Sequence, residues 1–396
     1  MKHKIPFKAA DILLPKGDHE KWAVIACDQF TSEPEYWKET EKAADGAPSA
    51  LNIILPEVYL DDGDTEKRIE QINRTMSEYL KNGVFEEYRD AMILVKRTLP
   101  DGRVRTGIVG EVSLDDYDYM PESKPKIRAT EGTVLSRIPP RVKIRKDAPL
   151  ELPHIMVLID DIENSVIGSV NPDSCKCLYD FKLMQGGGHL KGYLIEKPMQ
   201  EKITATLSAL CENDSDKEHP LLFAVGDGNH SLATAKACSE LIPSELAKYA
   251  LVEIVNIHDP ALDFEPIYRV LFNVDTNDLK RAVDEHFRDC SQSKVTLTCR
   301  NGSTEFFADG LTSKALQDFI DMYIEKNPGV SVDYIHGKES VNKLCQKENT
   351  VGFIFGGMSK SELFPYVREN GPLPRKTFSM GEAEDKRYYM EARKIR

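Results

Sequence analysis

The sequence predicts a mixed α/β (α+β) protein with more than one domain. Short apolar runs typical of buried strands alternate with segments of helical periodicity along the whole chain. The 396 residues exceed what one compact core usually supports. Hydrophobic residues make up 41% and charged residues 30%, an ordinary globular mixture. We therefore expect three α/β domains, over residues 1–125, 126–275 and 276–396.

The charge balance argues against a nucleic-acid-binding protein. The net charge is −13, with 65 acidic and 52 basic side chains, whereas phosphate backbones require clustered lysine and arginine. Two basic clusters, 137–146 and 386–396, are expected to lie on solvated faces. No apolar stretch reaches the length of a membrane span, and the first residues lack the features of a signal peptide. We expect a cytoplasmic protein that contacts neither membrane nor nucleic acid.

The cysteines do not predict a metal site. Among the eight, Cys175 and Cys177 are the only close pair, and structural zinc requires two such pairs at set spacing. We therefore expect reduced thiols in a reducing compartment.

The amino-terminal third predicts an alternating α/β unit that ends in a hairpin. Residues 99–102, Leu-Pro-Asp-Gly, combine proline with Asp-Gly turn chemistry between two apolar runs. The predicted elements are strands over 22–27, 92–97 and 103–112, helices over 33–44 and 64–81, and an extended segment over 51–60.

The remaining elements follow from the same rules. Gly186, Gly187 and Gly188 form either a flexible cradle or a plain hairpin turn, because the fingerprints of the known glycine-rich nucleotide loops are missing. Strands are predicted over 154–159, 220–225, 251–257, 305–308 and 351–355, and helices from 231 to before 243 and over 279–287 and 312–326.

Residues 225–231, Val-Gly-Asp-Gly-Asn-His-Ser, form the first candidate site. The predicted strand ends at Gly226-Asp227-Gly228, and a helix begins at Asn229-His230-Ser231, so unpaired N–H groups lie at the positive end of a helix. Asp227 could hold Mg²⁺ or take a proton from a substrate hydroxyl. The alternative is an ordinary turn with a satisfied histidine, and composition alone supports the two equally.

Two further segments carry candidate residues. Glu131 lies between Thr130 and Thr133 and is followed by Arg137 and Arg141, which suggests a general base or the rim of an anion site. The residues alone favour a solvated loop there. Lys376, near the end of the chain, could add a phosphate-binding lysine, and a tail strand explains it equally well.

Seven motifs occur in a set order along the chain. They are Leu55-Pro56-Glu57, the strand 107–110 running into Asp115-Asp116-Tyr117, Glu131-Gly132-Thr133, Asp227 to His230, the segment 259–269, Tyr334 to Gly337, and the Lys376-Thr377-Phe378 tail. No single motif is decisive, whereas their order is fairly specific. Over essentially the whole chain it resembles the prokaryotic domain-of-unknown-function family 1015.

The resemblance implies a fold and a set of residue roles. The family's usual Asp-Gly-His-His-Arg and His-Glu-x-Thr segments are similar to motifs of free serine kinases built on the ParB/sulfiredoxin nucleotide-binding fold. This implies a ParB/sulfiredoxin-like core over 126–275 with flanking α/β domains. Carried over to this sequence, the resemblance implies that Asp227, Gly228 and His230 form the catalytic phosphate site and that Glu131 is the base. From the residues themselves we expect Asp227 to hold Mg²⁺, and phosphate or nucleotide to contact Gly226, Gly228, Asn229, Ser231, Thr133, Arg137, Arg141 and Lys376.

The chain departs from the family pattern at three positions. Asn229 replaces the first histidine, Ser231 the arginine, and Thr130 the histidine before the glutamate. A serine cannot replace the charge of an arginine that clamps phosphate. These departures affect catalysis more than nucleotide binding.

The resulting hypotheses differ in chemistry. The first is a kinase that uses ATP or ADP with Mg²⁺ to phosphorylate a small hydroxyl metabolite, such as the amino acid serine. The second is a catalytically silent, nucleotide-binding regulatory protein. A ParB-like DNA-binding protein is disfavoured, because the chain has no basic recognition helix. A homodimer is left open.

Overall fold

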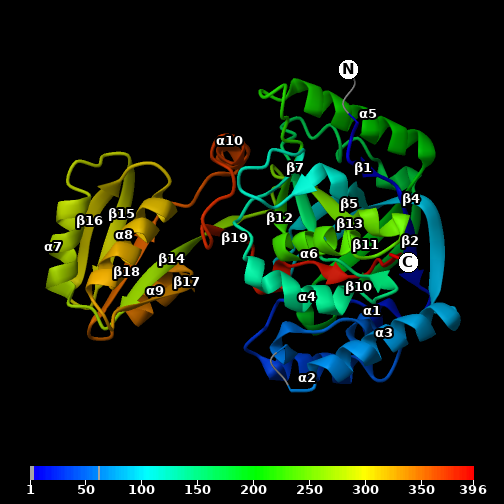
Figure 1. Cartoon of the computed structure of the whole chain (residues 1–396), viewed down its shortest axis with the longest axis horizontal. Coiled ribbons are helices and arrows are strands. Elements are labelled where there is room, and N and C mark those ends of the chain that lie inside the picture. The colour runs from blue at the N-terminus through cyan, green and yellow to red at the C-terminus, as the bar shows by residue number, and fades with distance from the viewer. Residues whose placement is uncertain (1–3, 61–62) are drawn as a thin grey trace. The chain divides into compact units, whose positions relative to one another are not determined.

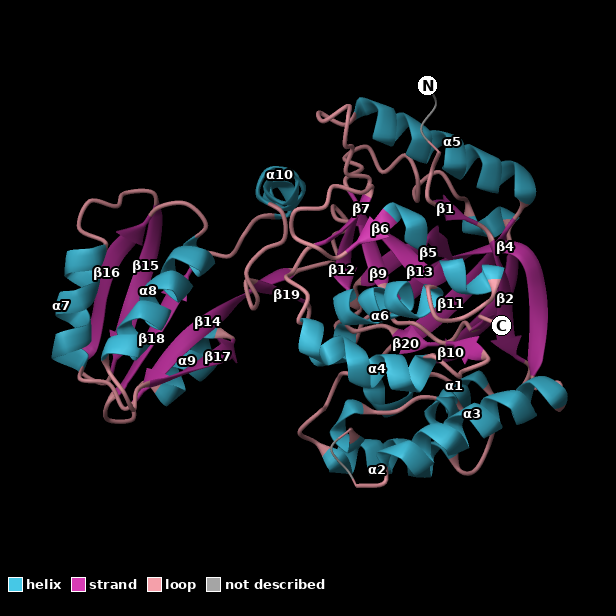
Figure 2. Cartoon of the chain, in the orientation of Figure 1, coloured by secondary structure: helices cyan, strands magenta, loops and turns pink. Residues whose placement is uncertain are grey.

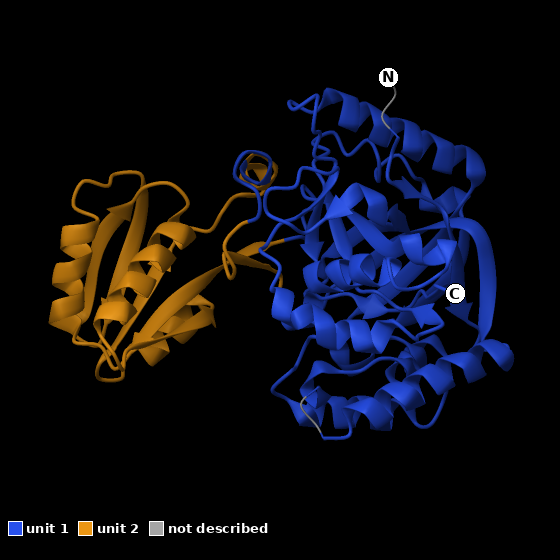
Figure 3. Ribbon diagram, in the orientation of Figure 1, with its two compact units in different colours: residues 1–262, 366–372, 382–396 blue, residues 263–365, 373–381 orange. Residues whose placement is uncertain are grey.

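The computed structural model describes residues 4–60 and 63–396, which fall into two compact units (Figure 3). Unit 1 comprises residues 1–262, 366–372 and 382–396, and unit 2 comprises residues 263–365 and 373–381. The boundary expected at 125/126 does not separate the two units, because strands from both sides of it pair in one sheet. The three-domain scheme and its ParB/sulfiredoxin-like core stay predictions.

Unit 1 is built on a mixed sheet in which the structure describes 11 strands (Figures 1 and 2). Parallel and antiparallel pairs both occur, so the predicted mixed α/β class is confirmed. β1 (Phe7–Lys8) pairs with β5, and β2 (Ala10–Pro15) pairs with β4. The other strands lie in the order β10 (Lys176–Lys182), β11 (His189–Ile195), β4 (Phe85–Thr98), β5 (Val104–Ser113), β13 (Tyr249–Asn256), β9 (Met156–Ile159), β12 (Phe223–Asp227), β7 (Ile127–Ala129) and β6 (Tyr117–Asp118).

Two hairpins follow from turn chemistry. The predicted hairpin over 92–112 is confirmed by the antiparallel pair β4 and β5, whose turn is closed by the Leu99 N–H donating to Arg103 O at 2.8 Å. The glycine-rich turn joins β10 to β11, so the plain hairpin turn is the correct alternative there. Gly188 has φ +90°, and a Cβ at this position would lie 2.1 Å from Thr98 O, so glycine is required.

Alternate residues of the central strands enter two separate cores. In β4, Ile93 and Val95 belong to one core, whereas Met92 and Leu94 belong to the other. The first core also contains Ile72 and Met76 of α3 (Thr65–Lys81), and the second contains residues of α5 (Lys197–Asn213). In Figure 1, α5 lies on one side of the sheet and α3 on the opposite side. The sheet is therefore covered on both faces.

The amino-terminal elements agree in part with the prediction. Helices α2 (Pro34–Ala44) and α3 lie where periodicity placed them. The strand predicted over 22–27 is shorter, because Trp22 ends α1 (His19–Trp22) and only β3 (Val24–Ile25) is extended. The extended segment predicted over 51–60 is wrong. It contains two 3₁₀ turns, Ala50–Ile53, which begins at Ser49 whose hydroxyl accepts from Leu51 N, and Glu57–Tyr59.

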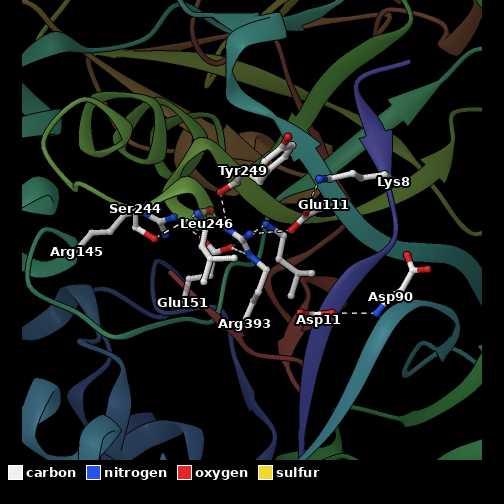
Figure 4. Close-up of polar contacts among 11 residues, drawn as sticks. Lys8, Asp11, Asp90, Glu111, Arg145, Glu151, Ser244, Leu246, Tyr249 and Arg393 are labelled. Carbon is white, nitrogen blue, oxygen red and sulfur yellow. Dashed lines mark hydrogen bonds and ion pairs between the residues drawn. The ribbon is translucent and has the colours of Figure 1, made fainter. Parts of the chain in front are cut away.

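The last residues of the chain lie inside unit 1. β20 (Tyr388–Tyr389) pairs with β3, and β21 (Arg393–Lys394) pairs with β8 (Leu150–Glu151). The solvated face predicted for 386–396 is therefore wrong. The arginines are buried because each meets two carboxylates: Arg387 pairs with Glu253 and Glu391, and Arg393 pairs with Glu111 and Glu151, as Figure 4 shows for Arg393.

Unit 2 has an antiparallel sheet and its own core. The strands lie in the order β16 (Gly302–Ala308), β15 (Ser293–Cys299), β18 (Thr350–Phe355), β14 (Phe264–Phe272) and β17 (Ser331–His336), and β19 (Phe378–Met380) also pairs with β14. Its helices are α7 (Thr276–His286), α8 (Thr312–Lys326) and α9 (Lys338–Leu344), and α10 (Lys360–Asn370) contains the boundary between residues 365 and 366. The helix predicted over 312–326 has the same bounds in the structure.

Two absences hold for residues 4–60 and 63–396. No helix there has the length and apolar composition needed to cross a membrane. All eight cysteines are free thiols, and the close pair is formed by half-buried Cys175 and exposed Cys177.

Candidate functional site

The two segments singled out in the sequence meet at one edge of the unit 1 sheet. β7 and β12 are neighbouring parallel strands, with Ala129 paired to Val225. Because parallel strands end at the same edge, Asp227, the last residue of β12, and Glu131, which follows β7, lie at that edge. This adjacency is what the resemblance required of a base and a phosphate cradle.

Hydrogen bonds join the two segments after the strands end. The buried Thr130 hydroxyl donates to Val225 O at 2.6 Å, and the Val134 N–H donates to Nε2 of His230 at 3.2 Å. The Val134 bond holds the His230 imidazole against the loop that follows Glu131. Thr130, which replaces the family's histidine, therefore ties the two strands together.

Helix α6 (Asn229–Ser239) begins directly after β12. Gly228 precedes it with φ +77°, and a Cβ there would lie 3.0 Å from the Ile155 backbone, so a larger residue would be strained. Asp227 accepts from the Gly228 N–H at 2.9 Å. The N-cap residue of α6 is Gly228, which has no side chain to accept from the N–H groups of the first turn. These groups form the positive end of a helix.

Two buried polar atoms at this edge have no hydrogen-bond partner among the residues that the structure describes. They are the hydroxyl of Thr133 and Oδ1 of Asn229, whose amide nitrogen donates to Val225 O at 3.3 Å. A buried polar atom without a partner costs about 1–3 kcal/mol, so a ligand at this edge would relieve that cost. The Thr133 hydroxyl can donate to a phosphate oxygen, and Asn229 Oδ1 can accept from a ligand hydroxyl. The donor set fits a phosphate-bearing ligand.

Lys386 brings a positive charge that sequence reasoning missed. β20 runs antiparallel to β3, and Lys386 precedes it. Its ammonium nitrogen lies 3.4 Å from Asp227 Oδ2, with side chains only 12% and 18% exposed. Lys386 was not predicted as a site residue because the basic tail was expected to face solvent. The alternation of Tyr388, Met390 and Ala392 could have indicated a buried segment.

A second group of polar side chains lies beside α6. β9 runs antiparallel to β12, so His154, which precedes β9, lies at the same edge as Asp227. Its Nε2 is 3.4 Å from Asp28 Oδ2 and 3.5 Å from Ser231 Oγ, and its Nδ1 is 2.7 Å from the Tyr389 hydroxyl. Sequence reasoning missed Asp28, His154 and Tyr389, since no short motif connects them.

The titration of His154 and Asp28 is coupled. Burial alone would lower the pKa of His154, but the Asp28 carboxylate, followed by Asp227 and Glu57, raises it above the usual value. Burial likewise opposes ionisation of Asp28, yet His154 and then Lys386 hold the pKa of this carboxyl well below its usual range. Each group therefore favours the charged form of the other.

This group does not have the geometry of a serine hydrolase. In a catalytic triad the histidine contacts the acid and the serine through opposite nitrogens, whereas His154 presents Nε2 to both. The neighbouring thiol is also unreactive. Burial raises the pKa of Cys27 to about 12, so the thiolate that could attack a substrate is absent at neutral pH.

Three other predicted site residues, Arg137, Arg141 and Lys376, lie on other elements of the fold. Arg137 is exposed at the end of the 3₁₀ turn Leu135–Arg137, and Arg141 in α4 (Ile138–Arg145) forms an ion pair with Glu57. Lys376 belongs to unit 2, so its contact with phosphate stays a prediction. The described residues contain no cluster of three metal-ligating side chains, and Mg²⁺ at Asp227 likewise stays a prediction.

Comparison with known proteins finds weak structural likeness and one family. A free serine kinase in complex with ADP superposes with a TM-score of 0.41 and 10% identity, covering 74% of this chain and 93% of its own. A conserved hypothetical protein from Pyrococcus furiosus gives 0.37 and 11%, covering 72% and 94%. A truncated SbnI from Staphylococcus aureus gives 0.36 and 12%, covering 69% and 82%.

The curated proteins contain no match to the sequence. The family described as "Protein of unknown function (DUF1015)" matches residues 5–394, in agreement with the motif order of the sequence, and the chain therefore belongs to the DUF1015 family.

Proposed function

We propose that the chain is a nucleotide-dependent phosphotransferase that acts on a small hydroxyl metabolite. One observation carries the proposal. Glu131 and the start of α6 follow adjacent parallel strands, and the Val134–His230 hydrogen bond joins the two segments. Glu131 and Asp227 are 96 residues apart in the sequence. Phosphoryl transfer depends mainly on positioning and charge neutralisation, and this edge combines a carboxylate with a helix amino terminus.

The start of α6 would hold the phosphates. Backbone N–H groups of the first turn, the Thr133 hydroxyl and Nδ1 of His230 are donors of suitable length. Gly228 gives the turn its left-handed conformation without a side chain. ATP or ADP would supply the phosphoryl group, and Asp227 would hold Mg²⁺, which would neutralise phosphate charge.

Glu131 would act as the general base. It takes the proton of the acceptor hydroxyl while the hydroxyl oxygen forms a bond to the terminal phosphorus. The bond from that phosphorus to the bridging oxygen then breaks, and its electron pair leaves with the shortened nucleotide. The Glu131 side chain is partly buried, which limits competing water.

Lys386 would supply the charge that Ser231 lacks. The family pattern has an arginine at position 231, and the serine there contacts His154 instead. The Lys386 ammonium lies beside Asp227 at the start of the same helix. A lysine acts on phosphate as a point charge, so it can neutralise the transferred group without the bidentate geometry of arginine.

A second candidate function is a silent, nucleotide-binding regulatory protein. The three departures from the family pattern have structural roles here. Thr130 and Asn229 both donate to Val225 O, and Ser231 contacts His154. Side chains that serve packing in this way are consistent with a site that binds nucleotide and no longer turns it over.

The two functions are separated by one pair of measurements. Thermal shift with ATP, ADP and AMP, each with and without Mg²⁺, tests binding, and transfer of labelled phosphate to a panel of hydroxyl metabolites that includes serine tests catalysis. Binding with transfer supports the kinase, and binding without transfer supports the regulatory protein. A failure of every nucleotide to shift the unfolding temperature contradicts both.

A further inference from the structure

Unit 1 contains a cavity of about 160 Å³ beside α6 that the preceding argument does not use. Its wall is mainly aliphatic. It is formed by the segment that contains the 3₁₀ turns Ala50–Ile53 and Glu57–Tyr59, by α3 and β8, and by the residues before β9. The side chains include Ile53, Leu55, Met76, Leu150, Leu152 and Ile155, of which Leu55 is only 6% exposed. A cavity with this lining favours hydrocarbon over water.

The charged groups of the wall already have partners. Arg141 pairs with Glu57, and Arg145 shares Glu151 with Arg393, so each of these charges has a partner. His154 faces Asp28. A zwitterionic amino acid would bring two further charges into this wall without partners, which is costly in a buried site. The lining therefore selects against a charged ligand.

The wall does offer hydrogen bonds to a neutral ligand. Ser231 and Thr234 place hydroxyls there, and Nε of Arg145 is buried without a partner among the described residues. A ligand hydroxyl can both donate and accept at such positions. Ser231 also lies in the first turn of α6, three residues after Gly228. A hydroxyl held at Ser231 would therefore lie at the end of the cavity next to the proposed phosphate site.

We propose that this cavity binds the hydrocarbon group of a neutral alcohol, and that this group is compact and has about six or seven carbon atoms. A cavity of about 150 Å³ accommodates benzene, which is of that size. The assignment of that alcohol as the phosphoryl acceptor rests on the proposed function. Binding of the alcohol itself does not. The cavity thus replaces the amino acid serine with a neutral, largely apolar substrate class.

Binding is tested on the full chain without nucleotide. Benzyl alcohol is the probe, and serine is the polar comparison; calorimetry or saturation-transfer NMR measures the dissociation constants. Benzyl alcohol is expected to bind at least about 10-fold more tightly than serine, because its ring replaces water against aliphatic side chains. Equal or reversed affinities overturn the proposal, and this comparison needs no variant.

A matched pair of variants locates the binding site. Ala148→Leu adds volume at the wall of the cavity, whereas Ala237→Leu makes the same change on α6 outside the wall. Ala148→Leu is expected to weaken benzyl alcohol binding at least about 10-fold, and Ala237→Leu to leave it within about 2-fold. Equal loss in both variants, or no loss in either, places the probe elsewhere and overturns the proposal.

The outcomes also separate this inference from the proposed function. Benzyl alcohol that binds in the cavity but accepts no phosphate supports the pocket and contradicts the acceptor assignment. Phosphate transfer to serine, with no binding of benzyl alcohol, supports the kinase and overturns the pocket.

Discussion

The backbone N–H of Val134 donates to Nε2 of His230 over 3.2 Å, although 96 residues separate the two. The bond fixes the loop after Glu131 against the first turn of α6. It also holds the imidazole ring in a fixed position at the start of α6. A phosphate at the helix start would therefore meet a positioned donor and a base on the neighbouring strand, which is the arrangement that the following predictions test.

Substitution of the two carboxylates should separate catalysis from binding. Glu131→Gln keeps the shape of the side chain and removes the base, so transfer should fall by about 100-fold or more while nucleotide affinity stays within about 3-fold. Asp227→Asn should impair both, because Asp227 also pairs with Lys386 and accepts from Gly228 N. Rates of phosphate transfer and nucleotide-induced thermal shifts measure the two effects. An unchanged rate in Glu131→Gln would show that another group is the base.

Removal of the Lys386 charge should weaken nucleotide binding. Lys386→Met keeps most of the apolar stem and deletes the ammonium beside Asp227, so affinity for ATP should fall about 10-fold, equivalent to about 1.4 kcal/mol. Titration calorimetry in the presence of Mg²⁺ measures this change.

Lys394→Met is the matched control for Lys386, because Lys394 pairs with Glu87 on a partly exposed surface. This variant should bind ATP as the wild type does. Lys386→Arg should recover part of the affinity, since the positive charge returns. Unaltered affinity in Lys386→Met would restrict the role of Lys386 to neutralising Asp227.

The local elements could be predicted from the sequence because their signals are local. The bounds of α8 and the turn at 99–102 follow from periodicity and turn residues, which depend on neighbours in the chain. The cradle at Asp227 and Gly228 was also visible, because strand, glycine and helix are consecutive. Short-range chemistry therefore sufficed for half of the candidate site.

The rest of the site depends on pairing between distant strands. The β20–β3 pair places Lys386 beside the end of β3, near Asp28, and the antiparallel β9–β12 pair places His154 near Asp227. The alternation from Tyr388 to Ala392 can indicate burial, but it does not indicate which strand β20 pairs with. The prediction of a solvated face over 386–396 failed for a similar reason. A charge cluster is ordinarily solvated, and burial of these arginines is tolerable only because carboxylates from distant parts of the chain pair with them.

Loss of the Arg393 charge should destabilise unit 1. Arg393→Met removes the positive charge between buried Glu111 and Glu151, so the free energy of unfolding should fall by about 3–5 kcal/mol. Both tryptophans, Trp22 and Trp37, are buried in unit 1, so their fluorescence during denaturant titration reports on this unit alone.

Arg396→Met is the control for Arg393, because Arg396 is 42% exposed and lies 3.8 Å from Asp147. Its free energy of unfolding should stay within about 0.5 kcal/mol of the wild type. A loss below about 1 kcal/mol in Arg393→Met would indicate that the two carboxylates find other partners when the arginine is removed.

The Asp28–His154 pair should stabilise unit 1 within a defined pH window. The pKa of His154 is raised in the folded state, so its contribution is present below the usual value of 6.5 and is lost as the pH rises through the folded pKa. The pKa of Asp28 is lowered, so its contribution is present above the usual 3.8 and is lost as the pH falls. Both contributions are complete only between these two values.

Asp28→Asn should therefore reduce the free energy of unfolding by about 1–3 kcal/mol near pH 5–6, with a smaller loss at pH 9, where the histidine is neutral. Asp45→Asn, at an exposed pair with Lys21, should show little pH dependence over this range. Tryptophan-monitored denaturation at pH 5, 7 and 9 measures the differences, and a loss in Asp28→Asn that grows with pH would contradict the assignment of a protonated His154.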